Sequence, residues 1–189
     1  MALMLLIGSR HSGKTSACRR LAALAQDRGL SVAGIISPAV YEAGECSGYQ
    51  VIDLSTRRSA RLASVAAAAA AGSSAERIGE FSFTFAGLAL GREALKHAAE
   101  VEPQLVIVDE VGPLELAGGG WAVHLDALAR RTGATIFAVR ASLVGEIARH
   151  WGPVDTCDLR AGVDVAVQTL LRWVAGALGD AESSRFITA

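Results

Sequence analysis

The sequence is poor in lysine and cysteine and has no long apolar run, and each shortage excludes a class of protein. It has two lysines against sixteen arginines and a formal net charge of −1, so no broad basic field attracts nucleic acid or anionic lipid. Its three cysteines are an odd number without metal-ligand spacing, which argues against a disulfide framework. No stretch approaches the ~20 apolar residues of a membrane helix. We therefore expect a cytoplasmic protein with no nucleic-acid partner and no membrane insertion.

The remaining composition indicates one globular domain. The chain has 189 residues, of which 51% are hydrophobic and 20% are charged, so it is long enough to bury a sizeable core. We expect a single domain over residues 1–179, followed by a flexible C-terminal tail over residues 180–189.

Continuous apolar runs alternate with helical spacing along most of the chain. The apolar runs predict strands at Leu3–Ile7, Ser31–Ser37, Gln104–Asp109, Ala134–Val139 and Val154–Cys157. The helical spacing predicts helices at 15–28, 87–100, 121–131, 142–150, with Ser142 as N-cap, and 163–178. This alternation predicts an α/β fold with a mainly parallel sheet and helices on both faces.

The segment from about 40 to 84 departs from this alternation. Tyr41–Gly48 is expected to be a polar turn, and Gly48–Leu54 and Ser59–Leu62 are expected to form an antiparallel hairpin. The alternating residues of Arg77–Thr84 predict one edge strand, and the alanine run Ala66–Ala71 predicts a surface helix turn or loop. We interpret the whole segment as an antiparallel hairpin insertion at one edge of the sheet.

The most specific motif follows the first predicted strand and reads Gly8-Ser9-Arg10-His11-Ser12-Gly13-Lys14-Thr15. It matches the phosphate-binding loop (P-loop) pattern G-x-x-x-x-G-K-[ST]. Its glycines let the backbone wrap an oxyanion, and the backbone N–H groups at the helix N-terminus favour negative charge. Lys14 is placed to reach the β- and γ-phosphates, and Thr15 to ligate Mg²⁺. The loop through Ser16 therefore predicts binding of a nucleoside triphosphate.

Two consecutive acids end the strand predicted at 104–109. Ligands of open α/β sheets bind beyond the carboxyl ends of the strands, so Asp109 and Glu110 should face the P-loop. In P-loop enzymes such an aspartate holds Mg²⁺ together with the loop hydroxyl of Thr15. Glu110 is expected to orient and activate the attacking water, while Lys14 stabilises the transition-state charge.

Arg140 ends the strand predicted at 134–139, on the same rim of the sheet as Asp109. An arginine there can stabilise charge on the γ-phosphoryl oxygens. The alternative is a salt bridge with Glu110 or Glu146.

The roles of two further sets of residues each allow two interpretations. Glu115 is either a helix-start acid or a residue that positions water or a neighbouring basic group. The hairpin arginines Arg57, Arg58 and Arg61 form either a solvated face or a second phosphate site.

The motifs together resemble the nucleoside-triphosphatase family first known from thermophiles. The matching segments are Gly8–Thr15, Ala33–Pro38, Gly48–Leu54, Gly79–Phe81, Val108–Leu116 and Val139–Arg140. The resemblance implies a RecA-like fold and slow hydrolysis of NTP to NDP and phosphate with loose base selectivity. It also implies that the metal, water and γ-phosphate roles fall on Thr15, Asp109 and Glu110. Ser16 stands where the family often has a second threonine, and its hydroxyl can serve the α-phosphate.

Two other function classes remain open at this point. A small-molecule or nucleotide kinase needs an acceptor pocket and an arginine-bearing lid, for which Pro153–Gly162 is a short candidate. A nucleotide-binding switch with little turnover needs an unknown protein partner. The loop Thr156–Arg160 is the candidate for contact with the base.

Overall fold

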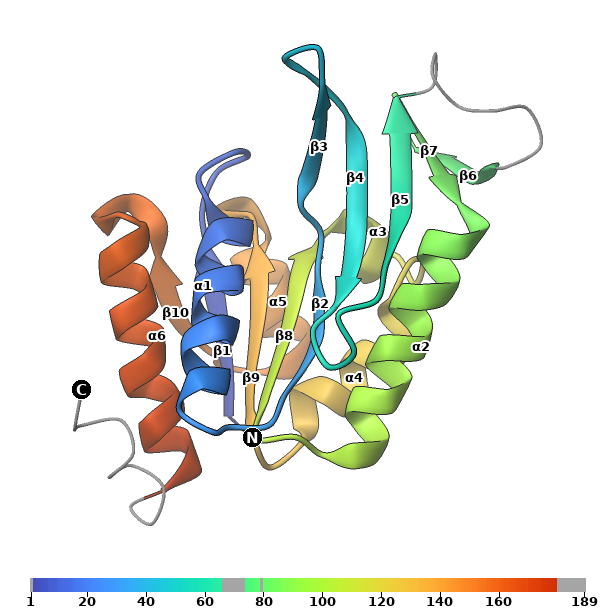
Figure 1. The fold of residues 1–189 in the computed structure, drawn as a ribbon. Helices are drawn as coiled ribbons and strands as arrows, with labels where there is room; N and C mark the ends of the chain where they lie inside the picture. Colours follow the sequence, from blue (N-terminus) through green and yellow to red (C-terminus); the bar gives the residue numbers. More distant parts are fainter. Residues whose placement is uncertain (1, 66–73, 79, 180–189) are drawn as a thin grey trace.

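The computed structural model describes residues 2–65, 74–78 and 80–179, and within them ten strands form one sheet (Figure 1). The strands are Ala2–Ile7 (β1), Val32–Ile36 (β2), Ala39–Glu42 (β3), Glu45–Asp53 (β4), Ser59–Val65 (β5), Ser74–Ile78 (β6), Phe81–Thr84 (β7), Leu105–Val111 (β8), Ala134–Val139 (β9) and Asp155–Asp158 (β10). Their order is β10-β1-β9-β8-β2-β4-β5-β7-β6, and β3 pairs with β4. The tail and Ala66–Ala71, on which we made predictions above, lie outside the described residues.

The parallel half of the sheet is covered by helices on both faces. Strands β10, β1, β9, β8 and β2 pair in parallel. The helices are Lys14–Asp27 (α1), Phe85–Val101 (α2), Pro113–Leu116 (α3), Ala122–Arg130 (α4), Val144–Trp151 (α5) and Val163–Leu178 (α6). Helices α1 and α6 pack on one face, and α2, α4 and α5 pack on the other.

Burial on both faces explains the continuous apolar runs of these strands. Neighbouring residues of a strand point to opposite faces, so Leu6 joins the core under α1 and α6 while Leu5 joins the core under α2 and α4. The predicted α/β class with a mainly parallel sheet is confirmed. Strand β9 lies between β1 and β8, so the loop after β1 and the acids of β8 are separated by one strand.

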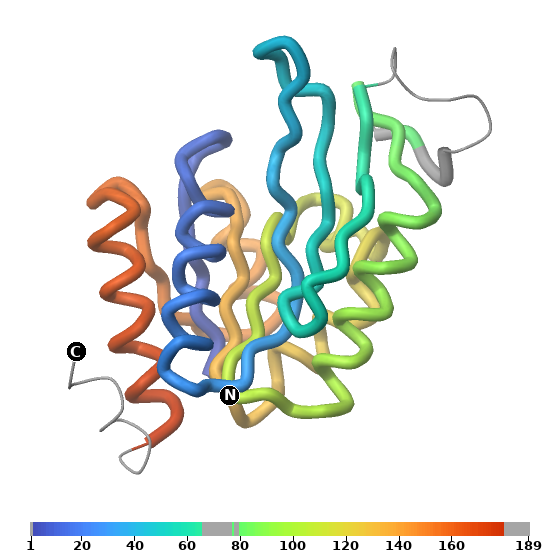
Figure 2. The backbone as a smooth tube through the Cα atoms, viewed as in Figure 1, coloured from blue at the N-terminus to red at the C-terminus, as the bar shows by residue number. Residues whose placement is uncertain are grey.

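Strands β3 to β7 form the antiparallel half of the sheet, as the sequence predicted in outline. Two details of the prediction were wrong. The polar turn predicted at Tyr41–Gly48 is a hairpin of β3 and β4, with its tip at Ala43 and Gly44 (φ 51° and 86°). The single edge strand predicted at Arg77–Thr84 is two strands, β6 and β7. Figure 2 shows the tip of the β3–β4 hairpin and the P-loop at the same end of the strands, at the top of the view.

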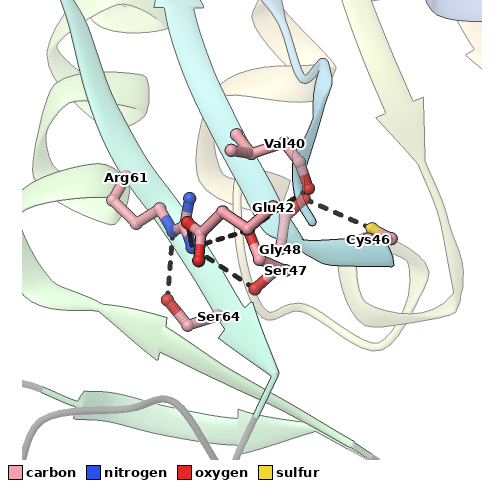
Figure 3. Close-up of polar contacts among 7 residues, drawn as sticks. All are labelled: Val40, Glu42, Cys46, Ser47, Gly48, Arg61 and Ser64. Carbon is pink, nitrogen blue, oxygen red and sulfur yellow. Dashed lines mark hydrogen bonds and ion pairs between the residues drawn. The ribbon is translucent and has the colours of Figure 1, made fainter. Parts of the chain in front are cut away.

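Two of the three hairpin arginines, Arg58 and Arg61, form ion pairs with neighbouring segments. Arg61 Nη2 pairs with Glu42 at 3.3 Å and donates to Ser47 Oγ at 3.1 Å, which ties β5 to the β3–β4 hairpin (Figure 3). Its Nε donates to Ser64 Oγ of β5 itself at 3.1 Å. Arg58 pairs with Glu93 of α2 at 3.1 Å. These pairs neutralise Arg58 and Arg61, in keeping with a solvated face.

The predicted N-cap Ser142 was also wrong. A short 3₁₀ turn, Ala141–Leu143, contains Ser142, and α5 then begins after Leu143 without a side-chain cap. Within the described residues, no helix is long and apolar enough to span a membrane.

Candidate active site

The P-loop connects β1 to α1, and its two glycines lie close to neighbouring side chains. Gly13 precedes α1 in the left-handed region (φ 98°), and a β-carbon there would lie 2.9 Å from Val163 of α6. A β-carbon on Gly8 would lie 2.4 Å from Ser12 Oγ. Both positions therefore require glycine, which explains their spacing in the motif.

Lys14 is buried at the start of α1, with 3% of its side chain exposed. Its Nζ donates to the Ser9 carbonyl at 2.8 Å and to the Gly8 carbonyl at 3.4 Å. The same Nζ lies 3.9 Å from Glu110 Oε1 of β8. The predicted P-loop lysine and the predicted water-activating acid therefore lie together.

Asp109 is fully buried on β8 and faces the P-loop. Burial raises the pKa of Asp109 to about 6, while the Thr15 side chain and the Ser37 N–H lower it. The Ser37 N–H donates to Asp109 Oδ2 at 3.1 Å, whereas Oδ1 has no hydrogen-bond partner among the described residues. One carboxylate oxygen of Asp109 thus remains available for a further ligand.

Glu110 has an unusual backbone conformation. The strand continues beyond the predicted end at Asp109 as far as Val111, but its register with β9 shifts between Val108 and Val111. Glu110 itself has φ 60°, which is uncommon for a residue other than glycine. Successive side chains of a regular strand point to opposite faces, and a bulge re-aims one of them. The irregularity therefore lets two consecutive acids serve one site.

Ser37 is a residue of this site to which the sequence analysis gave no role. It follows β2, is buried, and carries a hydroxyl oxygen without a partner among the described residues. In the sequence it was the last residue of the predicted strand Ser31–Ser37 and part of the matching segment Ala33–Pro38, without an assigned role. The pairing of β2 with β8 brings it against Asp109.

Glu115 caps the short helix α3 and also lines the cleft. Its Oε2 accepts from the Gly112 N–H at 2.9 Å. Burial raises the pKa of Glu115 to about 6, and hydrogen bonds from the backbone of Gly112, Glu115 and Trp121 oppose that shift. The helix-start interpretation is correct, and the side chain also lies among the cleft residues.

A cleft of about 740 Å³ runs from the P-loop past Glu110 toward the antiparallel half of the sheet. Arg140 is exposed and lines it, and within the described part of the chain it forms no ion pair with Glu110 or Glu146. Arg10 also lines it and lies 4.0 Å from Glu80. A hydrogen bond to the Tyr49 side chain, with the charge of Glu80, raises the pKa of Arg10.

The donor set of this cleft fits a hard cation such as Mg²⁺. Five buried side-chain N or O atoms lack a partner among the described residues. Ser12 Oγ and Ser37 Oγ belong to residues that line the cleft, and Asp109 Oδ1 belongs to the buried acid next to Glu110. Mg²⁺ prefers oxygen ligands and is usually held by one or two carboxylates and several waters. Outside the masked segments, no three His, Cys, Asp or Glu side chains gather as a closed metal cage.

Comparisons with known proteins agree with this geometry. The sequence profile of the family described as NTPase matches residues 4–153. Nucleoside-triphosphatase THEP1 of Methanopyrus kandleri is 30% identical over 160 residues, covering 85% of this chain and 82% of the relative. The nucleoside-triphosphatase THEP1 of Thermofilum pendens is 37% identical over 113 residues, covering 59% of each chain.

Two solved structures show the same fold at low sequence identity. THEP1 from the hyperthermophile Aquifex aeolicus superposes with a TM-score of 0.68 at 16% identity, covering 91% of this chain and 98% of that one. The human cancer-related nucleoside triphosphatase superposes with a TM-score of 0.64 at 19% identity, covering 89% of this chain and 98% of that one. The chain therefore belongs to the NTPase family and is a P-loop nucleoside-triphosphatase.

Proposed function

We propose that this enzyme hydrolyses nucleoside triphosphates as their magnesium complexes, with ATP and GTP both accepted. The convergence of two distant segments carries the proposal. Lys14 and Thr15 of the P-loop meet Asp109 and Glu110 of β8, with 3.9 Å between Lys14 Nζ and Glu110 Oε1. A P-loop lysine opposite a metal-binding aspartate is the arrangement that triphosphate hydrolysis uses.

Thr15 and Asp109 would hold the metal, because the Thr15 side chain lies near Asp109 and one Asp109 oxygen lacks a hydrogen-bond partner among the described residues. Ser37 supports this assignment, because its N–H fixes the other Asp109 oxygen and its hydroxyl is buried without a partner of its own. A magnesium ion held by Thr15 and Asp109 would supply positive charge to the triphosphate.

The phosphates would bind along the P-loop from Gly8 to Ser16. The backbone N–H groups and the start of α1 attract the anion. Lys14 would exchange its bonds to the Ser9 and Gly8 carbonyls for bonds to phosphate oxygens, since both carbonyls belong to the same loop. We assign the Ser16 hydroxyl to the α-phosphate.

Glu110 would orient and deprotonate the water that attacks the γ-phosphorus. It is the more exposed acid of the pair, with 43% of its side chain accessible, so it can reach water while Asp109 stays buried. A base in this role must be ionised, and Glu110 Oε1 lies 3.9 Å from the Lys14 Nζ. Arg140, on the rim and without a carboxylate partner among the described residues, would add positive charge at the γ-phosphoryl oxygens.

Broad base selectivity is supported by the loop that follows β10. A β-carbon on Gly8 would lie 3.3 Å from Leu159, so this loop adjoins the P-loop at the side away from β8. The Asp158 carboxylate accepts from the Arg160 N–H at 2.8 Å and from Arg160 Nε at 2.7 Å. We therefore assign the Asp158 carboxylate no role in selecting guanine.

A cytoplasmic location agrees with the state of the cysteines. Cys18, Cys46 and Cys157 are all free thiols, and burial raises the pKa of Cys18 and of Cys157. Buried thiols with a raised pKa are inert, as expected of structural cysteines in a reducing compartment.

Replacement of Glu110 by glutamine tests the assignment of the base. Glu110→Gln keeps the shape of the side chain and removes its basicity, so we expect phosphate release to fall about 100-fold or more while Mg²⁺–nucleotide affinity changes little. Phosphate release is measured with ATP, GTP, CTP and UTP, each with and without Mg²⁺.

Glu146→Gln is the matched control, because Glu146 lies on α5 and does not line the cleft. Its activity should equal that of the unmodified enzyme. Near-normal phosphate release by Glu110→Gln would refute the assignment, and activity that is independent of Mg²⁺ would refute the metal site.

A further inference from the structure

Part of the large cleft is lined by residues that have no role in the chemistry proposed above. Beyond Glu110, the cleft continues between two apolar walls, which we call the aromatic chamber. One wall comes from the antiparallel half of the sheet and consists of Tyr49, Leu62, Phe81 and Phe83. The other wall comes from α3 and the start of α4 and includes Leu114 and Trp121.

The walls of the aromatic chamber are fixed by packing. Tyr49 and Phe81 pack edge to face, with ring centroids 5.3 Å apart and an interplanar angle of 66°. Trp121 is 4% exposed and lies directly on Gly91 of α2, where a β-carbon would come within 2.3 Å of its ring. A chamber with such walls is preformed, as small-molecule sites usually are.

The position of the chamber separates it from the nucleoside of the bound triphosphate. Lys14, Thr15 and Asp109 place the β- and γ-phosphates toward β8. Strands β2, β4, β5 and β7 lie beyond β8, whereas β10 lies on the opposite side of β1. The nucleoside of the triphosphate would therefore extend toward β10, and the aromatic chamber lies past the γ-phosphate.

Charge at the chamber selects against a second phosphate. The whole cleft is lined by several ionisable residues: Arg10, Lys14, Arg19, Arg140, Glu80, Glu110 and Glu115. Of these, Glu80 and Glu115 are adjacent in sequence to the wall residues Phe81 and Leu114, and Arg10 lies 4.0 Å from Glu80. The chamber thus offers aromatic surface and acidic groups. Aromatic walls of this kind bind planar rings by stacking.

We infer that the aromatic chamber is a second ligand site, which binds an uncharged nucleoside while the magnesium triphosphate occupies the P-loop. The inference rests on the proposed function, because the triphosphate must lie with its γ-phosphate toward β8. The ring of the nucleoside would stack against Tyr49 and Phe81, and its ribose hydroxyls would lie toward Glu110.

Isothermal titration calorimetry tests this site on the full chain. The protein is saturated with Mg²⁺ and the non-hydrolysable analogue β,γ-imido-ATP, and adenosine, guanosine, cytidine and uridine are then titrated separately. We expect at least one nucleoside to bind the loaded protein at one site. Phe81→Ala should weaken that binding at least fivefold, because it removes a stacking wall, and Leu114→Ala on the opposite wall should weaken it as well.

Phe85→Ala is the matched control, because Phe85 follows β7 closely, is 64% exposed and does not line the cleft. It should bind the nucleoside as the unmodified protein does. The affinity of each variant for Mg²⁺–β,γ-imido-ATP, measured first, shows that the variant is folded.

Three results would overturn the inference: no binding of any of the four nucleosides to the loaded protein, displacement of the triphosphate analogue by the nucleoside, or unchanged binding in both wall variants. Phosphate release from NTP alone reports on the proposed function separately. A protein that hydrolyses NTP but binds no nucleoside refutes the chamber only, whereas a protein that does not bind the analogue refutes the proposed function.

Discussion

Single residues of the candidate site could be predicted where their chemistry coincides with a fixed spacing. Lys14 and Thr15 belong to one short motif, and Asp109 and Glu110 stand together after an apolar run, so their meeting followed from the rule for parallel sheets. Ser37 could not be predicted, because only the register of β2 on β8 brings it to Asp109. The positive φ of Glu110 likewise depends on the bulge against β9, which no local pattern shows.

Glu115 gives a prediction about stability at the residue scale. Burial raises the pKa of Glu115 to about 6, so the folded state favours the protonated carboxyl. The stability that this preference contributes to the folded state is lost as the pH rises through about 6. A shift of this size corresponds to about 2 kcal/mol. Between pH 4.5 and pH 7.5, the free energy of unfolding of the nucleotide-free protein should therefore fall less in Glu115→Gln than in the unmodified protein.

Urea unfolding at the two pH values measures this difference. Glu45→Gln, at an exposed position of β4, should keep the pH dependence of the unmodified protein. An identical pH dependence in Glu115→Gln would show that burial of this carboxyl does not cost free energy.

At the scale of helices and strands, the elements that could be predicted best are the strands buried on both faces of the sheet. Strands β1, β2, β8 and β9 are covered on both faces, so their apolar runs identify them without reference to a partner. Strand β3 was missed and β6 was only partly predicted, because each is a short segment whose strand conformation comes from hydrogen bonds to one neighbour. The same reason explains why β6 and β7 were merged into one predicted strand.

Helix caps give a prediction at this scale, with a matched pair of hydroxyl residues. Thr84 caps α2 by accepting from the Gly87 N–H at 3.0 Å, and its hydroxyl also donates to the Arg61 carbonyl. Thr84→Ala should lower the free energy of unfolding by about 1–2 kcal/mol. Ser142→Ala should change it by less than about 0.5 kcal/mol, because Ser142 makes no cap bond.

Urea unfolding of both variants at one pH provides the measurement. If Ser142→Ala were the more destabilised of the two, the assignment of the caps from the geometry would be wrong.

In the whole molecule, the two halves of one sheet carry different parts of the cleft. Its parallel half carries the P-loop and the acids of β8, and its antiparallel half carries most of the aromatic chamber. The cleft lies where the two halves meet, so binding of a magnesium triphosphate should stabilise the entire domain by mass action.

Thermal unfolding with β,γ-imido-ATP tests this coupling and the need for metal. At 100 times Kd the stabilisation is about 2.7 kcal/mol, which corresponds to a rise in Tm of about 5–10 °C for a domain of this size. Excess EDTA should remove most of that rise, and Lys14→Ala should remove it in the presence of Mg²⁺. A rise in Tm that survives both treatments would contradict a metal-dependent P-loop site.

The burial of Lys14 has a practical consequence, because the chain has one other lysine. Lys14 is 3% exposed and bonded to its own loop, while the side chain of Lys96 on α2 is 68% exposed. Acylation by an amine-directed reagent should therefore modify Lys96 rapidly and Lys14 slowly. The ratio of the two modified peptides in a mass spectrum would then report opening of the P-loop, with Lys96 as the internal standard.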